Sequence, residues 1–325
     1  MKKWENHGGN VNIIDNLNHS DIPKLIKCKD IHTLQFYAFK TPNTKTWNVL
    51  NELYEQHPNI GLRIHWFNQM DFLFYPLIPS IRNFDVASYN TLDYTPLLQN
   101  KALTDLGIGE TKSIAVDLSF ISEFRALKTL WIDGMKKGLE SVSQLPELER
   151  LTFRGIKMKN LDLVSNLRNL KQIRLLFGSY KNLEALSKVK SLKTLEISRT
   201  RQIPDYEFFK EMPNLNSLYL EGMSKMEELP DFQGLTNLKR IQIENNSRLT
   251  DISSLNSLQS LEIFLIWFPE NFKAAFRKSL ILQGFEFLIN SKTVKYTNLF
   301  HWLSEAQKTK LSDKGIVEWN YNLNI

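Results

Sequence analysis

The sequence contains a single cysteine, which limits both how the chain can be stabilised and which chemistry it can perform. Cys28 has no second thiol with which to form a disulfide inside the chain. No local motif places a base beside it, so we interpret Cys28 as a small buried apolar residue rather than a nucleophile. The absence of disulfides is typical of a reducing compartment, and we expect the protein to be cytoplasmic.

Long hydrophobic runs are also missing. The longest apolar stretches are Phe72–Ile78 and Ile263–Phe268, whereas a membrane-spanning helix needs roughly 20 apolar residues. The amino-terminal residues MKKWENHGGNVNIIDN contain two lysines but no apolar stretch behind them, so we expect no secretory signal. Together these features predict a soluble chain without a membrane partner.

Blocks of like charge are missing as well. The chain has 41 basic and 35 acidic residues, a net charge of +6, and no run of five or six like charges. Nucleic-acid-binding surfaces usually show clustered lysine and arginine. We therefore interpret the basic residues as solvated surface and do not expect nucleic acid as the partner.

Signatures of catalysis and of metal binding are absent. No pair of histidines encloses a glutamate at helical spacing, and no cysteine–histidine cluster has the spacing of a metal site. No nucleophile-elbow motif occurs. The segment 107–113 superficially resembles a phosphate-binding loop, but Thr111 replaces the glycine required before the lysine. We expect no enzymatic activity, no cofactor and no metal.

One feature is abundant, namely a repeat of the form apolar-x-x-apolar-x-apolar. Successive copies begin 20 residues apart (Leu238 to Leu258) to 24 residues apart (Leu103 to Leu127), which is within the range of leucine-rich repeats. The nine clear copies begin at Ile81, Leu103, Leu127, Leu148, Leu170, Leu192, Leu215, Leu238 and Leu258. Weaker copies around Leu34 and Leu62 extend the series toward the amino terminus.

Each copy predicts a strand followed by a tight helical return. The alternating positions suit a strand with one buried face. Apolar residues three apart follow, as in Leu139-Val142-Leu145, and this period suits 3-10 turns. One repeat cannot bury its own apolar face, but stacked neighbours can, so the strands should pair in parallel.

The segment LTNLKRIQIENNSRLTDISSLNSLQSLEI, Leu235–Ile263, resembles the internalin-like short repeats of bacterial leucine-rich-repeat proteins. Asn246 falls on the family's asparagine position, and Asp251-Ile252 resembles its return segment. The resemblance implies an α/β repeat fold: a right-handed, horseshoe-shaped solenoid with a curved parallel sheet on its concave face and short 3-10 or helical returns on its convex face. It also implies protein recognition.

The chain departs from the family at the asparagine position. Most other repeats have Met135, Ile156, Gly178, Thr200, Met223 or Ile266 there. One position earlier stand Gly134, Gly155 and Gly222, which we expect to permit a tight backbone turn instead.

We predict three segments: an amino-terminal cap at 1–30, a solenoid at 31–264 and a carboxy-terminal cap at 265–325. The first cap should contain a strand at 11–14 and a turn at 22–25, and a true helix is expected at 44–57. The second should contain a helix that Asn271 caps and that runs to Gly284, a strand at 285–289, a short helix beginning at Trp302 and a final strand at 317–321. Alternatively, the tail is a small binding module of its own.

The strand pattern predicts which side chains face outward on the concave sheet. Aromatic and arginine side chains gather on the central strands, and acidic ones follow toward the carboxyl end. Since Trp, Tyr and Arg are enriched at binding hot spots, this surface is the predicted partner site. Its residues are Trp131, Asp133, Arg154, Arg174, Glu196, Tyr219, Glu221 and Glu244. Two further outward positions are predicted at Glu262 and Phe264, and an ordinary hydrated sheet face is the simpler alternative.

The sequence therefore favours a monomeric, non-catalytic scaffold that binds a protein of unknown identity. An alternative is a targeting or inhibitory, immunity-like component of an enzyme or effector system. About sixty residues without cysteine follow the repeats, which argues against a self-contained ligase. Nucleic-acid or glycan binding is the third possibility.

Overall fold

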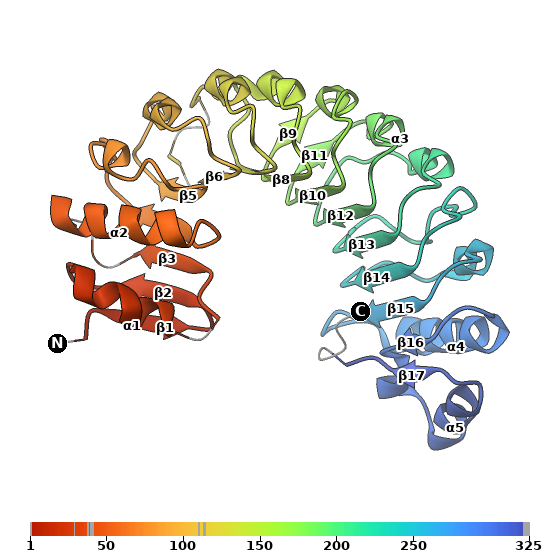
Figure 1. Cartoon of the computed structure of the whole chain (residues 1–325). Helices are drawn as coiled ribbons and strands as arrows, with labels where there is room; N and C mark the ends of the chain where they lie inside the picture. Colours follow the sequence, from red (N-terminus) through yellow and green to blue (C-terminus); the bar gives the residue numbers. More distant parts are fainter. Residues whose placement is uncertain are drawn as a thin grey trace. The chain divides into compact units, whose positions relative to one another are not determined.

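The computed structural model describes residues 2–28, 30–37, 39, 42–109, 111–112 and 115–320. Two compact units divide the chain, Met1–Ile156 and Lys157–Ile325. In each unit, strands line one side and short helical turns line the other (Figure 1).

The first unit is built on a sheet whose strands are neighbours in the order of the sequence. β1 and β2 form an antiparallel hairpin, and every later strand of this unit pairs in parallel with its predecessor. The strands are β1 Trp4–His7, β2 Asn10–Ile13, β3 Thr33–Phe36, β4 Gly61–Trp66, β5 Asn83–Ser88, β6 Asp105–Gly109, β7 Thr129–Asp133 and β8 Arg150–Arg154. Gly107 and Gly109 lie in β6, and Glu110 and Ser113 of the phosphate-loop resemblance fall outside the described residues.

Short helical segments connect these strands. They are η1 His19–Asp21, α1 Ile22–Ile26, α2 Thr44–Gln56, η2 Tyr75–Leu77, η3 Thr95–Gln99, η4 Ser119–Glu123 and η5 Leu139–Gln144. Helix α2 confirms the helix predicted at 44–57. It begins where the Asn43 side chain accepts a hydrogen bond from the Thr46 N–H at 2.9 Å, a good N-cap.

The second unit repeats the arrangement. A main sheet of parallel strands runs in the order β10, β12, β13, β14, β15, β16, β17, and β9 pairs with β11 in a separate two-stranded sheet. The strands are β9 Lys157–Met158, β10 Gln172–Leu176, β11 Ser179–Tyr180, β12 Thr194–Ser198, β13 Ser217–Glu221, β14 Arg240–Glu244, β15 Ile263–Trp267, β16 Tyr296–Thr297 and β17 Val317–Glu318. The helical segments are η6 Asp162–Val164, α3 Ala185–Lys188, η7 Glu207–Glu211, η8 Ser253–Ser257, α4 Ala274–Asn290, η9 Leu299–Trp302 and α5 Glu305–Asp313.

The core lies between strands and turns, as the repeat pattern predicts. On β12, Leu195 and Ile197 are fully buried, while Thr194 and Glu196, which alternate with them, remain partly exposed. Burying a leucine or isoleucine side chain contributes about 1.5–3 kcal/mol, so the stack of alternating residues supplies much of the stability. The predicted fold class, an α/β repeat with parallel strands and short 3-10 returns, is confirmed within each unit.

The residue that follows each central strand turns the backbone sharply. At this position Gly134, Gly155 and Gly222 have φ of +76°, +66° and +60°. Phe177, Arg199 and Asn245 occupy the same position and have φ of +54°, +48° and +54°. The prediction that the glycines permit a tight turn is confirmed, and the three other residues adopt the same left-handed conformation at a steric cost.

Asn246 forms side-chain hydrogen bonds with the backbone of the preceding repeat. Its buried Oδ1 accepts a hydrogen bond from the Met223 N–H at 2.7 Å, and its Nδ2 donates to the Leu220 carbonyl at 3.2 Å. Asn298 binds backbone in the same way, accepting from the Ile266 N–H at 2.9 Å and donating to the Ile266 carbonyl at 2.7 Å. Asn298 could not be predicted from the sequence, because its repeat lacks the leucine pattern.

The carboxy-terminal segment corrects several predictions. Helix α4 runs from Ala274 to Asn290, so the cap at Asn271, the end at Gly284 and the strand at 285–289 were wrong. The helix continues because Gly284, Phe287 and Leu288 share one buried face, on which Phe287 packs edge-on against Phe264 with ring centroids 5.7 Å apart.

The rest of this segment agrees in part with the prediction. The second helix, α5, begins after the Ser304 N-cap rather than at Trp302, which ends η9. A final strand is present as β17, and Tyr321 lies outside the described residues. That residues 1–30 and 265–325 act as caps stays a prediction.

Cys28 also differs from expectation. The side chain is partly exposed rather than buried, and its Sγ lies 3.7 Å from the Lys24 carbonyl oxygen. The turn that ends α1 places it at the surface.

Candidate partner-binding surface

The predicted partner site lies on the sheet face, which we define as the side of each unit's strands that points away from the helical turns. In the first unit Trp131 and Asp133 are on β7, and Arg154 is on β8. Asp133 and Arg154 are neighbours in register, and the Arg154 Nη1 donates to the Asp133 Oδ2 at 2.5 Å. All three side chains are partly exposed, so the structure places them as predicted.

In the second unit the sheet face carries a bidentate ion pair. Arg174 on β10 and Glu196 on β12 are neighbours in register. The Arg174 Nε donates to one carboxylate oxygen at 2.5 Å and its Nη2 donates to the other at 3.3 Å. Two parallel hydrogen bonds fix the guanidinium plane, so the pair is ordered before any partner arrives.

Tyr219 on β13 organises the next part of the second unit's sheet face. Its hydroxyl donates to Glu244 on β14 at 2.7 Å and lies 3.4 Å from Glu221. Glu221 is held by the Ser198 hydroxyl at 2.5 Å and the Arg199 Nε at 3.0 Å. The structure thus brings the five predicted residues of this unit, Arg174, Glu196, Tyr219, Glu221 and Glu244, onto consecutive strands.

The electrostatic environment keeps this tyrosine protonated. Burial raises the pKa of Tyr219, and the hydrogen bond to Glu244 and the negative charges of Glu244, Glu221 and Glu196 raise the pKa further. Glu244 also accepts hydrogen bonds from the Gln242 Nε2 at 3.2 Å and the Asn245 Nδ2 at 3.3 Å. All its partners among the described residues are neutral, so its negative charge is available to a basic group.

The outward positions predicted on β15 were wrong. Ile241 pairs with Phe264 and Gln242 pairs with Leu265, so Phe264 points into the core and Leu265 points outward. Glu262 precedes the strand and binds Lys295 at 2.8 Å. Leu265 is nevertheless fully buried.

The carboxy-terminal segment provides the cover over Leu265. Trp319 packs against Leu265 and Ile263, and Tyr296 and Trp267 lie at the edge of this cluster. The Arg240 guanidinium lies 5.0 Å from the Trp319 ring centroid, within the range of a cation–π contact. Here the tail covers part of the sheet face.

A row of exposed aromatic side chains in the first unit was missed. Tyr37, Phe67 and Tyr89 directly follow β3, β4 and β5 and are 66%, 62% and 42% exposed. The rings of Phe67 and Tyr89 stack with centroids 5.1 Å apart and planes at 12°. Aligning the irregular first repeats by their strand ends would have revealed the row, because each aromatic residue holds the same position. We call these three residues the aromatic row.

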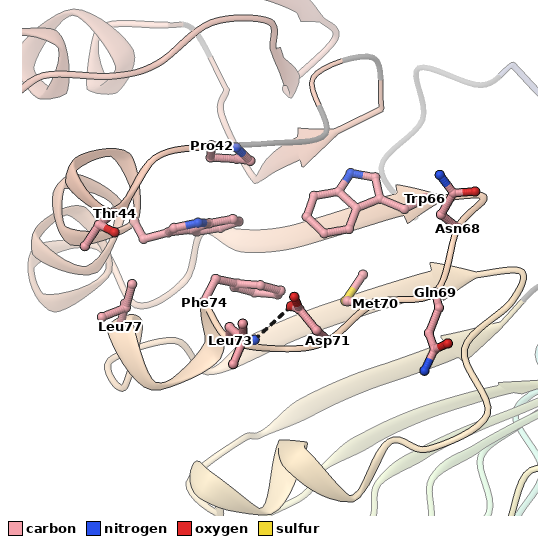
Figure 2. Close-up of a pocket in the computed structure, with 11 residues that line it drawn as sticks. Pro42, Thr44, Trp66, Asn68, Gln69, Met70, Asp71, Leu73, Phe74 and Leu77 are labelled. Carbon is pink, nitrogen blue, oxygen red and sulfur yellow. Dashed lines mark hydrogen bonds between the residues drawn. The ribbon is translucent and has the colours of Figure 1, made fainter.

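A pocket of about 450 Å³ lies beside the aromatic row in sequence, since its lining residues Trp66 and Asn68 flank Phe67. Figure 2 shows Trp66, Met70 and Phe74 around it, and Leu73 at its rim is 77% exposed. Phe74 is held from behind by Trp47 of α2, whose ring lies 4.3 Å away in a stacked arrangement. Aromatic and aliphatic side chains line the pocket together with the polar Thr44, Asn68, Gln69 and Asp71, and it is large enough for a side chain of a partner.

The described part of the chain contains no group of three histidine, cysteine, aspartate or glutamate side chains that could hold a metal ion. In the same residues, no helix is long and apolar enough to cross a membrane.

Comparisons with known proteins show a likeness of fold. No protein-family model matches the sequence, and no curated protein matches it. An internalin (InlF) of Listeria monocytogenes is 12% identical, covering 92% of this chain and 93% of its own, with a TM-score of 0.47. A leucine-rich-repeat protein of Leptospira interrogans is 16% identical, covering 82% of this chain and 73% of its own, with a TM-score of 0.48. Internalin C2 of Listeria monocytogenes is 17% identical, covering 60% and 83%, with a TM-score of 0.41.

The fold assignment does not depend on these likenesses, because it follows from the strands themselves. Eight of the nine clear copies of the apolar repeat coincide with strands, and short turns connect these strands. Neighbouring strands from β2 to β8 in the first unit, and those of the main sheet in the second unit, pair in parallel. Each unit of the chain therefore has a leucine-rich-repeat fold.

Proposed function

We propose that the chain is a non-catalytic scaffold that recognises a partner protein through its sheet face. The main support for the proposal is that side chains of this face are already held in place by hydrogen bonds within the chain. Arg174 is locked to Glu196 by two hydrogen bonds, and Tyr219 is locked to Glu244 by one. Side chains that are already fixed lose little entropy when a partner docks, so they favour binding over an ordinary hydrated surface.

The two units offer different chemistry to a partner. The first unit presents the aromatic row and the adjoining pocket, which suit an apolar anchor residue. The second presents Glu244, a carboxylate with neutral partners only, which suits a lysine or arginine. We therefore propose that the first unit receives an apolar anchor residue and that the second receives a basic side chain.

The test compares partner capture by folded variants. The protein is immobilised and exposed to lysate of the source cell, and captured proteins are quantified by mass spectrometry. One variant combines Trp131→Ala, Arg174→Ala and Tyr219→Ala. A second combines Phe67→Ser and Tyr89→Ser. The control combines three exposed lysines away from the strands, in Lys188→Ala, Lys278→Ala and Lys292→Ala, and circular dichroism verifies that each variant is folded.

We expect at least one protein that wild type and the control capture and that either sheet-face or aromatic-row variant loses. Titration of that purified partner should then show a loss of more than about 1 kcal/mol for the variant, as is usual at hot spots. Partners that both variants retain at wild-type affinity would contradict binding at these surfaces.

A further inference from the structure

Five cationic side chains line a single hollow of about 540 Å³ in the unit Lys157–Ile325. They are Lys157, Lys159, Lys181, Arg201 and Lys225. No aspartate or glutamate is among the residues that line it, although the chain contains 35 of them. We call this hollow the basic loop pocket. It shares none of its residues with the predicted sheet-face site.

The backbone that carries these cations is held in a fixed framework. Lys157 pairs with Ser179, and Met158 pairs with Tyr180, in the two-stranded sheet of β9 and β11. The chain of the next repeat joins this framework, because the Tyr180 N–H donates to the Arg201 carbonyl at 3.0 Å. A parallel bridge also joins Ser179 to Arg201. Main-chain hydrogen bonds therefore hold the backbone of Lys157 and Arg201 on neighbouring repeats.

None of the five cations forms an ion pair or a side-chain hydrogen bond with another described residue, in contrast to Arg154, Arg174 and Arg199 on or beside the sheet face. Glu270 lines an adjoining hollow that shares Arg201, yet no ion pair joins these two side chains. Like charges around one hollow repel each other, and an anion that occupies it removes this cost. The pocket thus offers an anion several exposed cations that no acidic side chain of the described residues neutralises.

The floor of the pocket is apolar. It contains Met158, Ile203, Tyr206 and Met223, and the Tyr206 ring stacks on Phe209 with planes at 6°. Thr200 contributes a hydroxyl whose partner is the Met223 sulfur at 3.8 Å, a weak acceptor. A cationic rim over an aromatic and thioether floor suits a ligand that combines phosphate groups with a flat apolar portion. The volume is that of an ordinary small-molecule site.

We propose that the basic loop pocket binds a soluble organic phosphate of nucleotide size. The phosphates contact Lys159, Lys181 and Arg201, and the flat portion rests on Tyr206. The site could not be recognised in the sequence, because Lys159, Lys181 and Arg201 are about one repeat apart and no run of like charge occurs. The proposal stands whether or not a protein binds the sheet face, because the two sets of residues are separate.

The test uses the full chain and isothermal titration calorimetry with ATP, inorganic tripolyphosphate and adenosine as probes. The variant combines Lys159→Gln, Lys181→Gln and Arg201→Gln. A charge-matched control combines Lys188→Gln, Lys278→Gln and Lys292→Gln, which removes the same charge from exposed positions outside the pocket. Vesicles of phosphatidylserine serve as a fourth probe, because a lipid headgroup also presents phosphate.

We expect ATP to bind more tightly than tripolyphosphate and adenosine not to bind. The pocket variant should weaken ATP binding at least about tenfold, since charged hydrogen bonds contribute strongly, while the control keeps wild-type affinity. Absence of ATP binding, or equal weakening in the control, would overturn the proposal. Equal affinity for tripolyphosphate and ATP would show that the pocket recognises only phosphates, which would contradict a role for the organic part of the ligand. Binding to vesicles alone would show that the pocket binds a membrane surface instead.

Discussion

The hydroxyl of Tyr219 lies between two carboxylates, donating to Glu244 at 2.7 Å while Glu221 remains 3.4 Å away. A phenol has one proton, so it can satisfy only the nearer carboxylate fully. The Ser198 hydroxyl and the Arg199 Nε donate hydrogen bonds to Glu221. Because each carboxylate has its own donor, Glu221 and Glu244 can lie on neighbouring strands. The tyrosine is therefore a structural link of the sheet face as well as part of the proposed partner surface.

Tyr219→Phe tests this link. The change removes the donor to Glu244 and leaves the ring in place, so we expect a loss of about 1–3 kcal/mol in the free energy of unfolding, the range for a hydrogen bond to a charged group. Urea denaturation measures it. Tyr89→Phe is the control, because Tyr89 is 42% exposed. Equal, negligible losses in both variants would show that the bond to Glu244 contributes nothing.

The buried tyrosines predict instability in alkali. Burial raises the pKa of Tyr206 to about 12 and raises the pKa of Tyr54, Tyr75, Tyr94, Tyr180 and Tyr219 as well. A raised folded-state pKa contributes stability that is complete below the unfolded value of about 10 and is lost as the pH rises through the folded value. We expect the melting temperature to fall steadily above about pH 10.

Absorbance at the phenolate band checks the same point. At least six of the ten tyrosines should ionise only when the chain unfolds, as judged by circular dichroism on the same samples. A smooth titration of all tyrosines near pH 10 with the fold intact would contradict the burial of these rings.

The alternation of buried residues could be predicted from the sequence because it is local. Leu195 and Ile197 are spaced as a half-buried strand requires, and the structure buries both. On β15 the pattern misleads, because Leu261 and Ile263 satisfy the repeat as well as Phe264 and Ile266 do. The choice between these registers is made by the tail, through Phe287 on one side and Trp319 on the other, and no local pattern contains that information.

The candidate sites also contain some residues that could be predicted from the sequence and some that could not. The outward positions of Arg174 and Tyr219 follow from strand alternation, so they could be predicted. Their partners Glu196 and Glu244 also follow once the register of the repeat is known. The aromatic row and the basic loop pocket lie in loops, where repeat lengths vary and spacing no longer aligns the residues. Only the three-dimensional structure shows Lys159, Lys181 and Arg201 around one hollow.

A substitution at the turn position after a strand should change stability through the backbone conformation alone. Gly134 has φ of +76°, and a β-carbon added there would have no neighbour within 4 Å. Gly134→Ala should therefore cost about 1–2 kcal/mol from the left-handed conformation alone. Thermal and urea unfolding measure the loss. Phe177→Gly, at the same position of a later repeat, should relieve part of this strain, and a stabilised Gly134→Ala would show that the turn is not left-handed.

Replacing Asn246 should lower the free energy of unfolding by more, because hydrogen bonds are lost. Asn246→Ala leaves the buried Met223 N–H and Leu220 carbonyl without their partner, and each unsatisfied group costs about 1–3 kcal/mol. Asn256→Ala is the matched control, because Asn256 is exposed and donates only to the Ser253 carbonyl at 2.9 Å. Urea denaturation should separate the two variants clearly. Similar stabilities would mean that water replaces Asn246 without cost.

The last prediction concerns Trp319, which covers Leu265 at the end of the sheet face. Leu265 occupies an outward strand position and yet is fully buried, because Trp319 packs on it. Leu265→Ala should cost about 2–5 kcal/mol, the usual price of a core leucine, whereas Leu282→Ala should cost little because Leu282 is 51% exposed. Trp319→Ala removes the other half of the contact, so the double variant should lose less than the sum of the single losses. Additive losses, or a Leu265 variant as stable as the Leu282 variant, would show that the tail does not cover the sheet in solution and that this part of the sheet face is open to a partner.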